Sequence, residues 1–183
     1  ELQSKETQEK TYESLASSPF NKIRFCVFPK HYVYNLKEPA QYPFEIRENS
    51  PWSPSDFETE KLEKAPRNMF GGIDAMIENP DEVWDYTRPN PSYFEHIENT
   101  IARLGTMGIQ ADLILLHPYD RWGYSRMNLE QQNFYLRYVV NRFSAYHNVW
   151  WAMANEFDLF RWKPVSEWES NAETVCRQDP YRH

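Results

Sequence analysis

Clusters of basic residues and long apolar runs are the two features that this chain lacks. Lys and Arg total 20 residues against 27 Asp and Glu, which gives a net charge of −7, and the basic residues form no run or stripe. Because nucleic-acid binding draws on clustered Lys and Arg, the composition argues against a nucleic-acid partner. No apolar stretch approaches the roughly 18 residues of a transmembrane helix, so the sequence predicts no membrane span.

Cysteine is scarce, and the first residues contain no signal segment. Two cysteines cannot build a disulfide scaffold. Cys26 lies in an apolar, strand-like run and Cys176 on the apolar side of a helical stretch, so both are expected to be small core residues. Residues 1–6 lack a basic stretch followed by an apolar one. That absence carries little weight if the chain begins inside a larger protein.

Aromatic side chains are present in excess. Trp, Tyr and Phe make up 16% of the 183 residues, and 40% of all residues are hydrophobic, which is enough for the core of one domain. Aromatic rings stack on the apolar faces of sugars, and they also simply fill cores. Composition alone leaves both uses open.

Helical and strand signals alternate along the chain. Apolar, strand-like runs occupy three segments, and the segments before, between and after them keep helical spacing: strands at 23–28, 109–116 and 148–154, helices at 6–17, 90–105, 128–146 and 166–176. The order is therefore α-β-α-β-α-β-α, with helices long enough to cross over between parallel strands. This order predicts an α/β fold with three parallel strands and about four helices.

Three of the expected helices carry start signals. Asn90 is followed by Pro91 at the first helical position. Asn128 with Gln131, and Ser166 with Glu169, each have the spacing of a capping box. In the last helix the apolar positions are expected to face inward, namely Trp168, Ala172, Val175 and Cys176.

One segment, 36–90, breaks this alternation. It holds more than half of the thirteen prolines and shows no sustained period. A structureless loop of such length is uncommon inside a compact domain unless it serves a site. Because the segment leaves the carboxyl end of the first strand, we expect a long Pro-rich insertion on the face that carries the site, where it would wall or cover a cleft. A peripheral decoration without a role is the alternative.

All three strands end in polar and aromatic residues. The three endings are Lys30-His31-Tyr32, His117-Pro118-Tyr119-Asp120-Arg121-Trp122 and Asn155-Glu156-Phe157-Asp158. Neighbouring parallel strands lie about 5 Å apart and end at the same edge of a sheet, so these residues are expected to converge in one pocket. A lone His after a strand is more often structural, but three polar strand ends on one face favour a site.

Glu156 is the candidate catalytic acid at this edge. Burial beside Trp150, Trp151 and Phe157 would raise its pKa by disfavouring the charged form. A carboxyl group that stays protonated near neutral pH can give its proton to a leaving group. Asn155 beside it is a neutral donor for a substrate hydroxyl.

The other polar residues of the strand ends each have two interpretations. His117 is expected either to donate to the same sugar or to orient a carboxylate. Asp120 and Arg121 either contribute to the pocket or pair with one another at its rim. Trp122 and Trp84 either stack on a sugar face or pack in the core or a loop.

A metal site is not expected. His31, His117, Asp120 and Asp158 are the residues that would form one, but none of them has a compact ligand spacing such as His-x-x-x-His. The sequence likewise implies no cofactor.

Long segments of the chain resemble one group of bacterial glycoside hydrolases, the apiosidase-like (β/α)8 barrels related to glycoside hydrolase clan A. Residues 18–32 resemble the region of the second barrel strand, 109–123 the third strand and its loop, and 138–158 the third helix and fourth strand. The resemblance covers roughly 7–35 and 90–183, and long segments are more specific than an Asn-Glu pair alone.

The resemblance implies a function and a fold. In that clan the Asn-Glu pair after the fourth strand supplies the general acid/base, which lands on Asn155 and Glu156, and the nucleophile is a Glu after the seventh strand. The chain, 1–183, is then expected to be a partial catalytic domain, part of a TIM (β/α)8 barrel that is not closed, without that nucleophile. A complete barrel takes about 250 residues. The substrate would be an oligo- or polysaccharide, and such bacterial proteins are often secreted or periplasmic.

Two functional hypotheses therefore remain. In the first, the parent protein is a retaining glycosidase with Glu156 as acid/base, and the pocket is shaped by Asn155, His117, Lys30, His31, Tyr32, Asp120, Arg121 and Trp122. In the second, a partial barrel binds sugar weakly or only packs against the missing remainder of the barrel. A complete three-stranded protein is disfavoured because the strands are apolar on both faces and would leave open edges. We therefore predict an open sheet and poor solubility of the chain alone.

Overall fold

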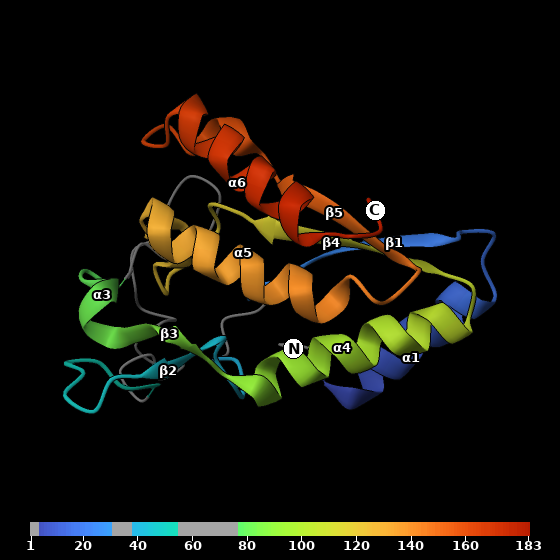
Figure 1. The fold of residues 1–183 in the computed structure, drawn as a ribbon. Coiled ribbons are helices and arrows are strands. Elements are labelled where there is room, and N and C mark those ends of the chain that lie inside the picture. Colours follow the sequence, from blue (N-terminus) through green and yellow to red (C-terminus); the bar gives the residue numbers. More distant parts are fainter. Residues whose placement is uncertain (1–3, 31–37, 55–76) are drawn as a thin grey trace.

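A three-stranded parallel sheet forms the centre of the chain, as a computed structural model shows for residues 4–30, 38–54 and 77–183 (Figure 1). The strands are β1 (Lys22–Cys26), β4 (Gln110–Leu116) and β5 (Val149–Ala154). They lie in the order β1-β4-β5, so that β4 pairs in parallel with both neighbours. The predicted α/β class and the three parallel strands are confirmed.

Long helices provide the crossovers that parallel strands require. One precedes β1 and one follows each strand: α1 (Lys5–Ala16), α4 (Pro91–Thr106), α5 (Leu129–Phe143) and α6 (Val165–Gln178). In Figure 1, α4, α5 and α6 succeed one another along one side of the sheet, as in a (β/α)8 barrel. The described part of the chain also contains a short helix, α3 (Pro80–Val83). It therefore has five α-helices, where the sequence predicted about four. None of these helices is long and apolar enough to cross a membrane.

The sheet is open. Within the described residues, β1 and β5 each pair on one side only. Register places Arg24, Asp112 and Trp150 in one row across the three strands. Arg24 pairs with Asp112 at 2.8 Å, Lys22 lies 3.5 Å from the centre of the Trp150 ring, and that ring is 46% exposed. The prediction of an incompletely closed sheet with exposed edges is confirmed, whereas poor solubility stays a prediction.

A second, two-stranded sheet lies within the Pro-rich segment. It pairs β2 (Phe44–Ile46) with β3 (Trp84–Pro89) in antiparallel fashion. Within β3, Trp84 and Tyr86 are buried and Asp85 between them is not. This alternation spans too few residues to stand out among the prolines.

The aromatic excess fills the core between the two sheets. Phe28, which follows β1, stacks on Tyr135 of α5 with ring centres 4.3 Å apart and on Tyr124 at 4.9 Å. Phe44 of β2 meets Tyr86 of β3 at 5.0 Å. All of these rings are buried, so the core-filling alternative is the one that the structure shows for them.

Two of the three predicted helix starts are present. The Asn90 side chain caps α4 through the Ser92 N–H, and Asn128 with Gln131 forms a capping box on α5. The capping box expected at Ser166 is wrong, because α6 begins one residue earlier, at Val165, with Pro164 as its N-cap and no side-chain cap.

The expected burial of the cysteines is only partly confirmed. Cys26 is half-buried, but Cys176 is exposed, so its expected place in the core is wrong. Val175, the neighbouring residue, is the buried one among the apolar side chains expected to face inward from α6, and Asn171 is buried as well.

The capping boxes give a test with a built-in control. Asn128→Ala removes the side-chain acceptor for the Gln131 N–H and should lower the free energy of unfolding by about 1 kcal/mol. Ser166→Ala should change it by less than about 0.5 kcal/mol, because Ser166 is not a cap. Urea unfolding of the two variants measures the difference, and equal losses would contradict the assignment of the α6 start.

A pair of glycines tests the turn that follows β4. Gly123 has a φ of +89°, and a Cβ there would lie 2.6 Å from Pro80 Cβ. Gly108 has a φ of +72° with nothing within 4 Å of such a Cβ. Both alanine variants pay the strain of a positive φ, but only Gly123→Ala also forces a clash, which adds about 1–3 kcal/mol of destabilisation. Thermal unfolding should therefore give Gly123→Ala the lower Tm, and similar Tm values would contradict the packing of α3 on this turn.

Candidate active site

The residues that follow β4 and β5 meet at the carboxyl edge of the sheet. The Asn155 N–H donates to the Leu116 carbonyl at 3.1 Å, which extends the β4–β5 pairing to the last residue before Glu156. The Val27 N–H likewise donates to the Ile114 carbonyl at 2.9 Å and carries the β1–β4 pairing beyond β1. Backbone pairing thus fixes where the polar strand ends lie.

Glu156 has an unusual backbone and an exposed side chain. Its φ of 50° and ψ of 55° lie in the left-handed region, which non-glycine residues rarely adopt and which is frequent at functional sites. The prediction that Glu156 is buried is wrong, because its side chain is exposed among the residues that the structure describes. Phe157 is itself 62% exposed, and Trp151 points elsewhere, since its Nε1 donates to Asp179 Oδ2 at 3.0 Å.

Asn155 is half-buried and is held by a side chain that sequence reasoning did not single out. Its Nδ2 donates to the Tyr119 hydroxyl at 3.0 Å and lies 3.5 Å from Glu156 Oε2. Tyr119 was part of the polar ending of β4 but was not among the candidate residues. Its place two residues after His117 was the only signal for it in the sequence.

Tyr119 also contacts His117 at its own strand end, after β4, and Lys30 at the end of β1. Its ring is stacked on His117 with centres 5.8 Å apart and planes 15° apart. The Lys30 ammonium group, beyond β1, lies 4.5 Å from the centre of the Tyr119 ring. The structure therefore brings Lys30, His117, Tyr119 and Asn155 together, whereas His31 and Tyr32 lie outside the described residues.

His117 is buried, and both of its ring nitrogens bond to the main chain. Its Nδ1 accepts from the Tyr119 N–H at 3.2 Å, which leaves the proton on Nε2 to be donated to the Phe28 carbonyl, also at 3.2 Å. Burial lowers the pKa of His117, so the ring is neutral near neutral pH. In this arrangement His117 ties the end of β1 to the loop after β4, and a direct contact with sugar stays a prediction.

Asp120 holds the turn after β4. One carboxylate oxygen accepts from the N–H groups of Gly123 and Tyr124, and the other accepts from the Ser125 N–H at 2.9 Å. These bonds hold the start of a short 3-10 helix at Tyr124–Arg126. The alternative of an Asp120–Arg121 pair at an exposed rim is not what the structure shows, because both residues are buried.

Arg121 and Trp122 share one carboxylate, Glu38, which sequence reasoning missed. Arg121 Nη2 donates to Glu38 Oε1, and Trp122 Nε1 donates to Oε2 at 2.8 Å. Tyr42 donates to the same oxygen at 2.5 Å. Burial lowers the pKa of Arg121 to about 10. The Pro-rich segment is therefore joined to the loop after β4 through a partly buried ion pair.

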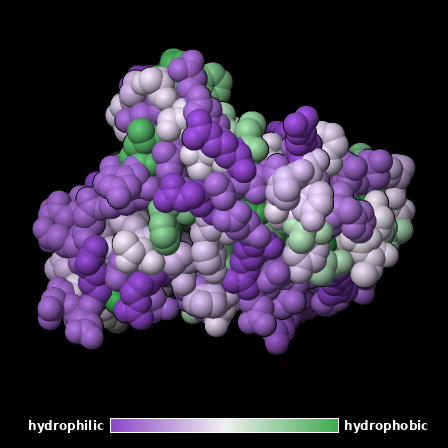
Figure 2. All heavy atoms as spheres, in the orientation of Figure 1, coloured by the Kyte–Doolittle hydropathy of each residue, from purple (hydrophilic) through white to green (hydrophobic). Residues whose placement is uncertain are grey.

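The two tryptophans expected to stack or to pack are both in the core. Trp122 and Trp84 are fully buried, and Trp84 Nε1 donates to the Trp122 carbonyl at 2.8 Å. Packing is the alternative that the structure shows for these rings. Exposed apolar side chains follow Glu156 instead, namely Phe157, Leu159, Trp162 and Val165. Figure 2 shows hydrophobic patches near α6 on an otherwise largely hydrophilic face.

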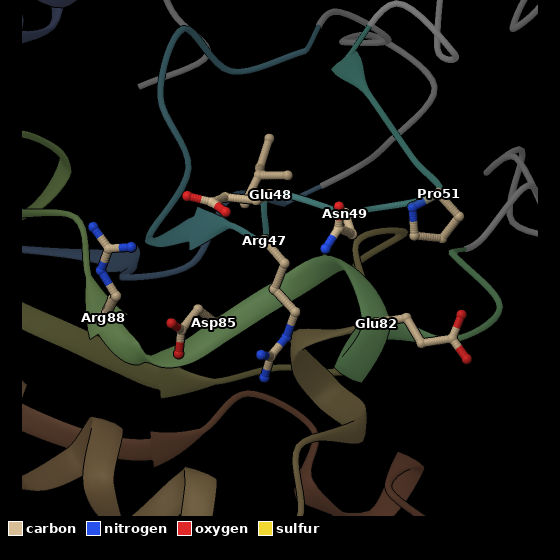
Figure 3. A pocket seen from close by; sticks show the side chains of 8 residues that line it. Arg47, Glu48, Asn49, Pro51, Glu82, Asp85 and Arg88 are labelled. Carbon is tan, nitrogen blue, oxygen red and sulfur yellow. The ribbon is translucent and has the colours of Figure 1, made fainter.

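A hollow of about 600 Å³ lies away from the strand ends, on β2 and β3 (Figure 3). Asp85 sits in it between Arg47 and Arg88, whereas Glu82 points away. A hydrogen bond from Thr87 lowers the pKa of Asp85, helped by the two arginines. A carboxylate held ionised in this way is a poor proton donor.

A known family matches most of the chain. Residues 45–183 match the model of apiosidase-like catalytic domains. No curated protein sequence matches the chain.

Solved structures agree with this family. A crystal structure of a candidate glycoside hydrolase from Bacteroides vulgatus is 40% identical, with a TM-score of 0.77 over 99% of this chain. A glycoside hydrolase family 5 structure from Bacteroides vulgatus, at 13% identity and a TM-score of 0.54, and another glycoside hydrolase, at 14% and 0.57, share the fold.

The chain spans only part of these proteins. The match to the 40% identical relative includes 99% of this chain but 31% of the length of the relative. For the other two structures, the matched shares of their length are 31% and 32%. The sheet of three parallel strands with crossover helices thus corresponds to a portion of glycoside hydrolase barrels. On the match over 45–183 and the 40% identity, the chain belongs to the family of apiosidase-like catalytic domains.

Proposed function

We propose that this chain contributes the acid/base half of the site of a retaining glycoside hydrolase, with Glu156 as the general acid/base. The observation that carries the proposal is the position of Glu156. It directly follows Asn155 at the carboxyl end of β5, with a left-handed backbone and an exposed carboxylate, in a chain of a glycoside-hydrolase-like family. The carboxyl edge is where barrel enzymes carry their catalytic groups.

The chemistry requires two carboxylates. In the first step Glu156 gives its proton to the glycosidic oxygen while a second carboxylate attacks the anomeric carbon and forms a covalent intermediate. In the second step Glu156 takes a proton from water, which attacks that carbon and releases the nucleophile. The two carboxyl groups must lie about 5–5.5 Å apart.

The nucleophile is proposed to come from a further part of the barrel. Asp120 is poorly suited, because its two oxygens already accept three backbone N–H groups. The 31% share of the 40% identical relative leaves room for the strand that the resemblance implies.

The substrate is proposed to be an oligo- or polysaccharide. Asn155 and Lys30, together with His31 and Tyr32, would contact the sugar. The enclosed residues act one step away by fixing the loop after β4, and these are His117, Asp120, Arg121 and Trp122.

A non-catalytic partial barrel is the second candidate. The observation that favours it is the exposed apolar cluster after Glu156, with Phe157 62% and Trp162 57% exposed. Such rings can bind a sugar face without any chemistry.

Glu156→Gln separates the two candidates. In a protein that carries this chain together with the further strands, the variant should lose about 10²- to 10⁴-fold in kcat/KM on glycosides with unactivated alcohol leaving groups. The loss should be much smaller for a dinitrophenyl glycoside, because this leaving group departs without a proton. Added azide, which attacks without a general base, should raise the turnover of the variant.

The controls are a second carboxylate and the short chain. Glu169→Gln, on the exposed surface of α6, should leave kcat/KM unchanged. The 183-residue chain should show no turnover of aryl glycosides. Turnover by that chain that survives Glu156→Gln would rule out the assignment.

A further inference from the structure

We propose that Tyr119 is a positioning residue of the catalytic pair, which sets the orientation of the Asn155 amide through its hydroxyl. This inference rests on the proposed function of Glu156, and it adds a residue that neither the family match nor the sequence pattern singles out. Tyr119 is the one described side chain seen to contact the ends of all three strands, through Lys30, His117 and Asn155.

The Tyr119 ring is fixed on three counts. The neutral His117 ring stacks on it, the Lys30 ammonium group lies 4.5 Å from its centre, and its own N–H donates to His117 Nδ1. A cation over an aromatic face is attracted by the electron density of the ring. His117 is in turn anchored on the Phe28 carbonyl, so the position of the ring is set by the backbone of β1 and β4.

Hydrogen-bond donors and acceptors then determine the orientation of the amide. Asn155 Nδ2 carries two hydrogens, and its neighbours are the Tyr119 hydroxyl at 3.0 Å and Glu156 Oε2 at 3.5 Å. Both of these oxygens can accept a hydrogen bond, so the nitrogen rather than the oxygen of the amide lies on this side. With its nitrogen held by Tyr119, Asn155 cannot rotate freely.

A fixed amide matters for the reaction because its hydrogen bonds to the sugar strengthen in the transition state. Hydrogen bonds to the sugar 2-hydroxyl become stronger in the transition state of glycosidases. An amide beside the acid/base that is held in place supplies such a bond without a further cost in side-chain entropy. Tyr119 thus acts through Asn155 and not on the leaving group.

The test is a double-mutant cycle on kcat/KM in the protein with the further strands. Tyr119→Phe keeps the ring, and with it the contacts to Lys30 and His117, and removes only the hydroxyl. We expect about a 5- to 10-fold loss, the size of one hydrogen bond, mainly in kcat. In an Asn155→Ala background the same change should cost less than about 2-fold, because the partner is gone.

Leaving groups separate this inference from the proposed function. The loss caused by Tyr119→Phe should be equal for dinitrophenyl and alkyl glycosides, whereas the loss caused by Glu156→Gln should depend on the leaving group. If only the second pattern fails, the role of Glu156 is wrong and the coupling of Tyr119 to Asn155 still stands. Tyr138→Phe on α5, whose hydroxyl accepts from Arg142 at 2.9 Å, is the matched control and should not change kcat/KM.

A measurement without turnover completes the test. In the ¹⁵N-labelled protein with the further strands, the side-chain amide resonances of Asn155 should shift in Tyr119→Phe and stay in place in Tyr138→Phe. Additive losses in the cycle, or unmoved Asn155 resonances in Tyr119→Phe, would overturn the inference.

Discussion

The parallel pairing of β4 with both β1 and β5 is the constraint on which the rest of the structure depends. Because all three strands run the same way, the residues after them emerge at one edge of the sheet. The contacts among the strand ends follow from this alignment, including the bond from Asn155 to Tyr119 and the bond from His117 to the Phe28 carbonyl. Parallel pairing also demands long crossovers, which α4 and α5 supply.

Patterns that repeat over many residues were predictable from the sequence. The three strands, the four long helices and the Asn128 cap each rest on several positions that agree. Features that depend on partners distant in the chain were not. Glu38 contacts Arg121 across more than eighty residues of sequence, and the residues around Glu38 contain no pattern that predicts this contact. The start of α6 and the exposure of Cys176 were missed because a local pattern fits more than one helix phase and start.

The candidate site divides into residues that face the edge and residues that hold them. Sequence reasoning found the polar strand ends but could not separate these groups, because burial is set by packing. Asp120, Arg121 and Trp122 proved to be enclosed, and Tyr119 proved to connect Lys30 with Asn155. Glu156 was expected to be shielded by Phe157, yet both are exposed where the sheet stays open.

The central claim is that Glu156 protonates the glycosidic oxygen. The most direct measurement is a crystal structure of the protein with the further strands, bound to a substrate analogue that resists hydrolysis. The account predicts a Glu156 carboxyl oxygen at about 2.6–3.2 Å from the glycosidic oxygen, with Asn155 bonded to the same sugar. A sugar bound with another carboxyl group at that oxygen, and Glu156 out of reach, would contradict it.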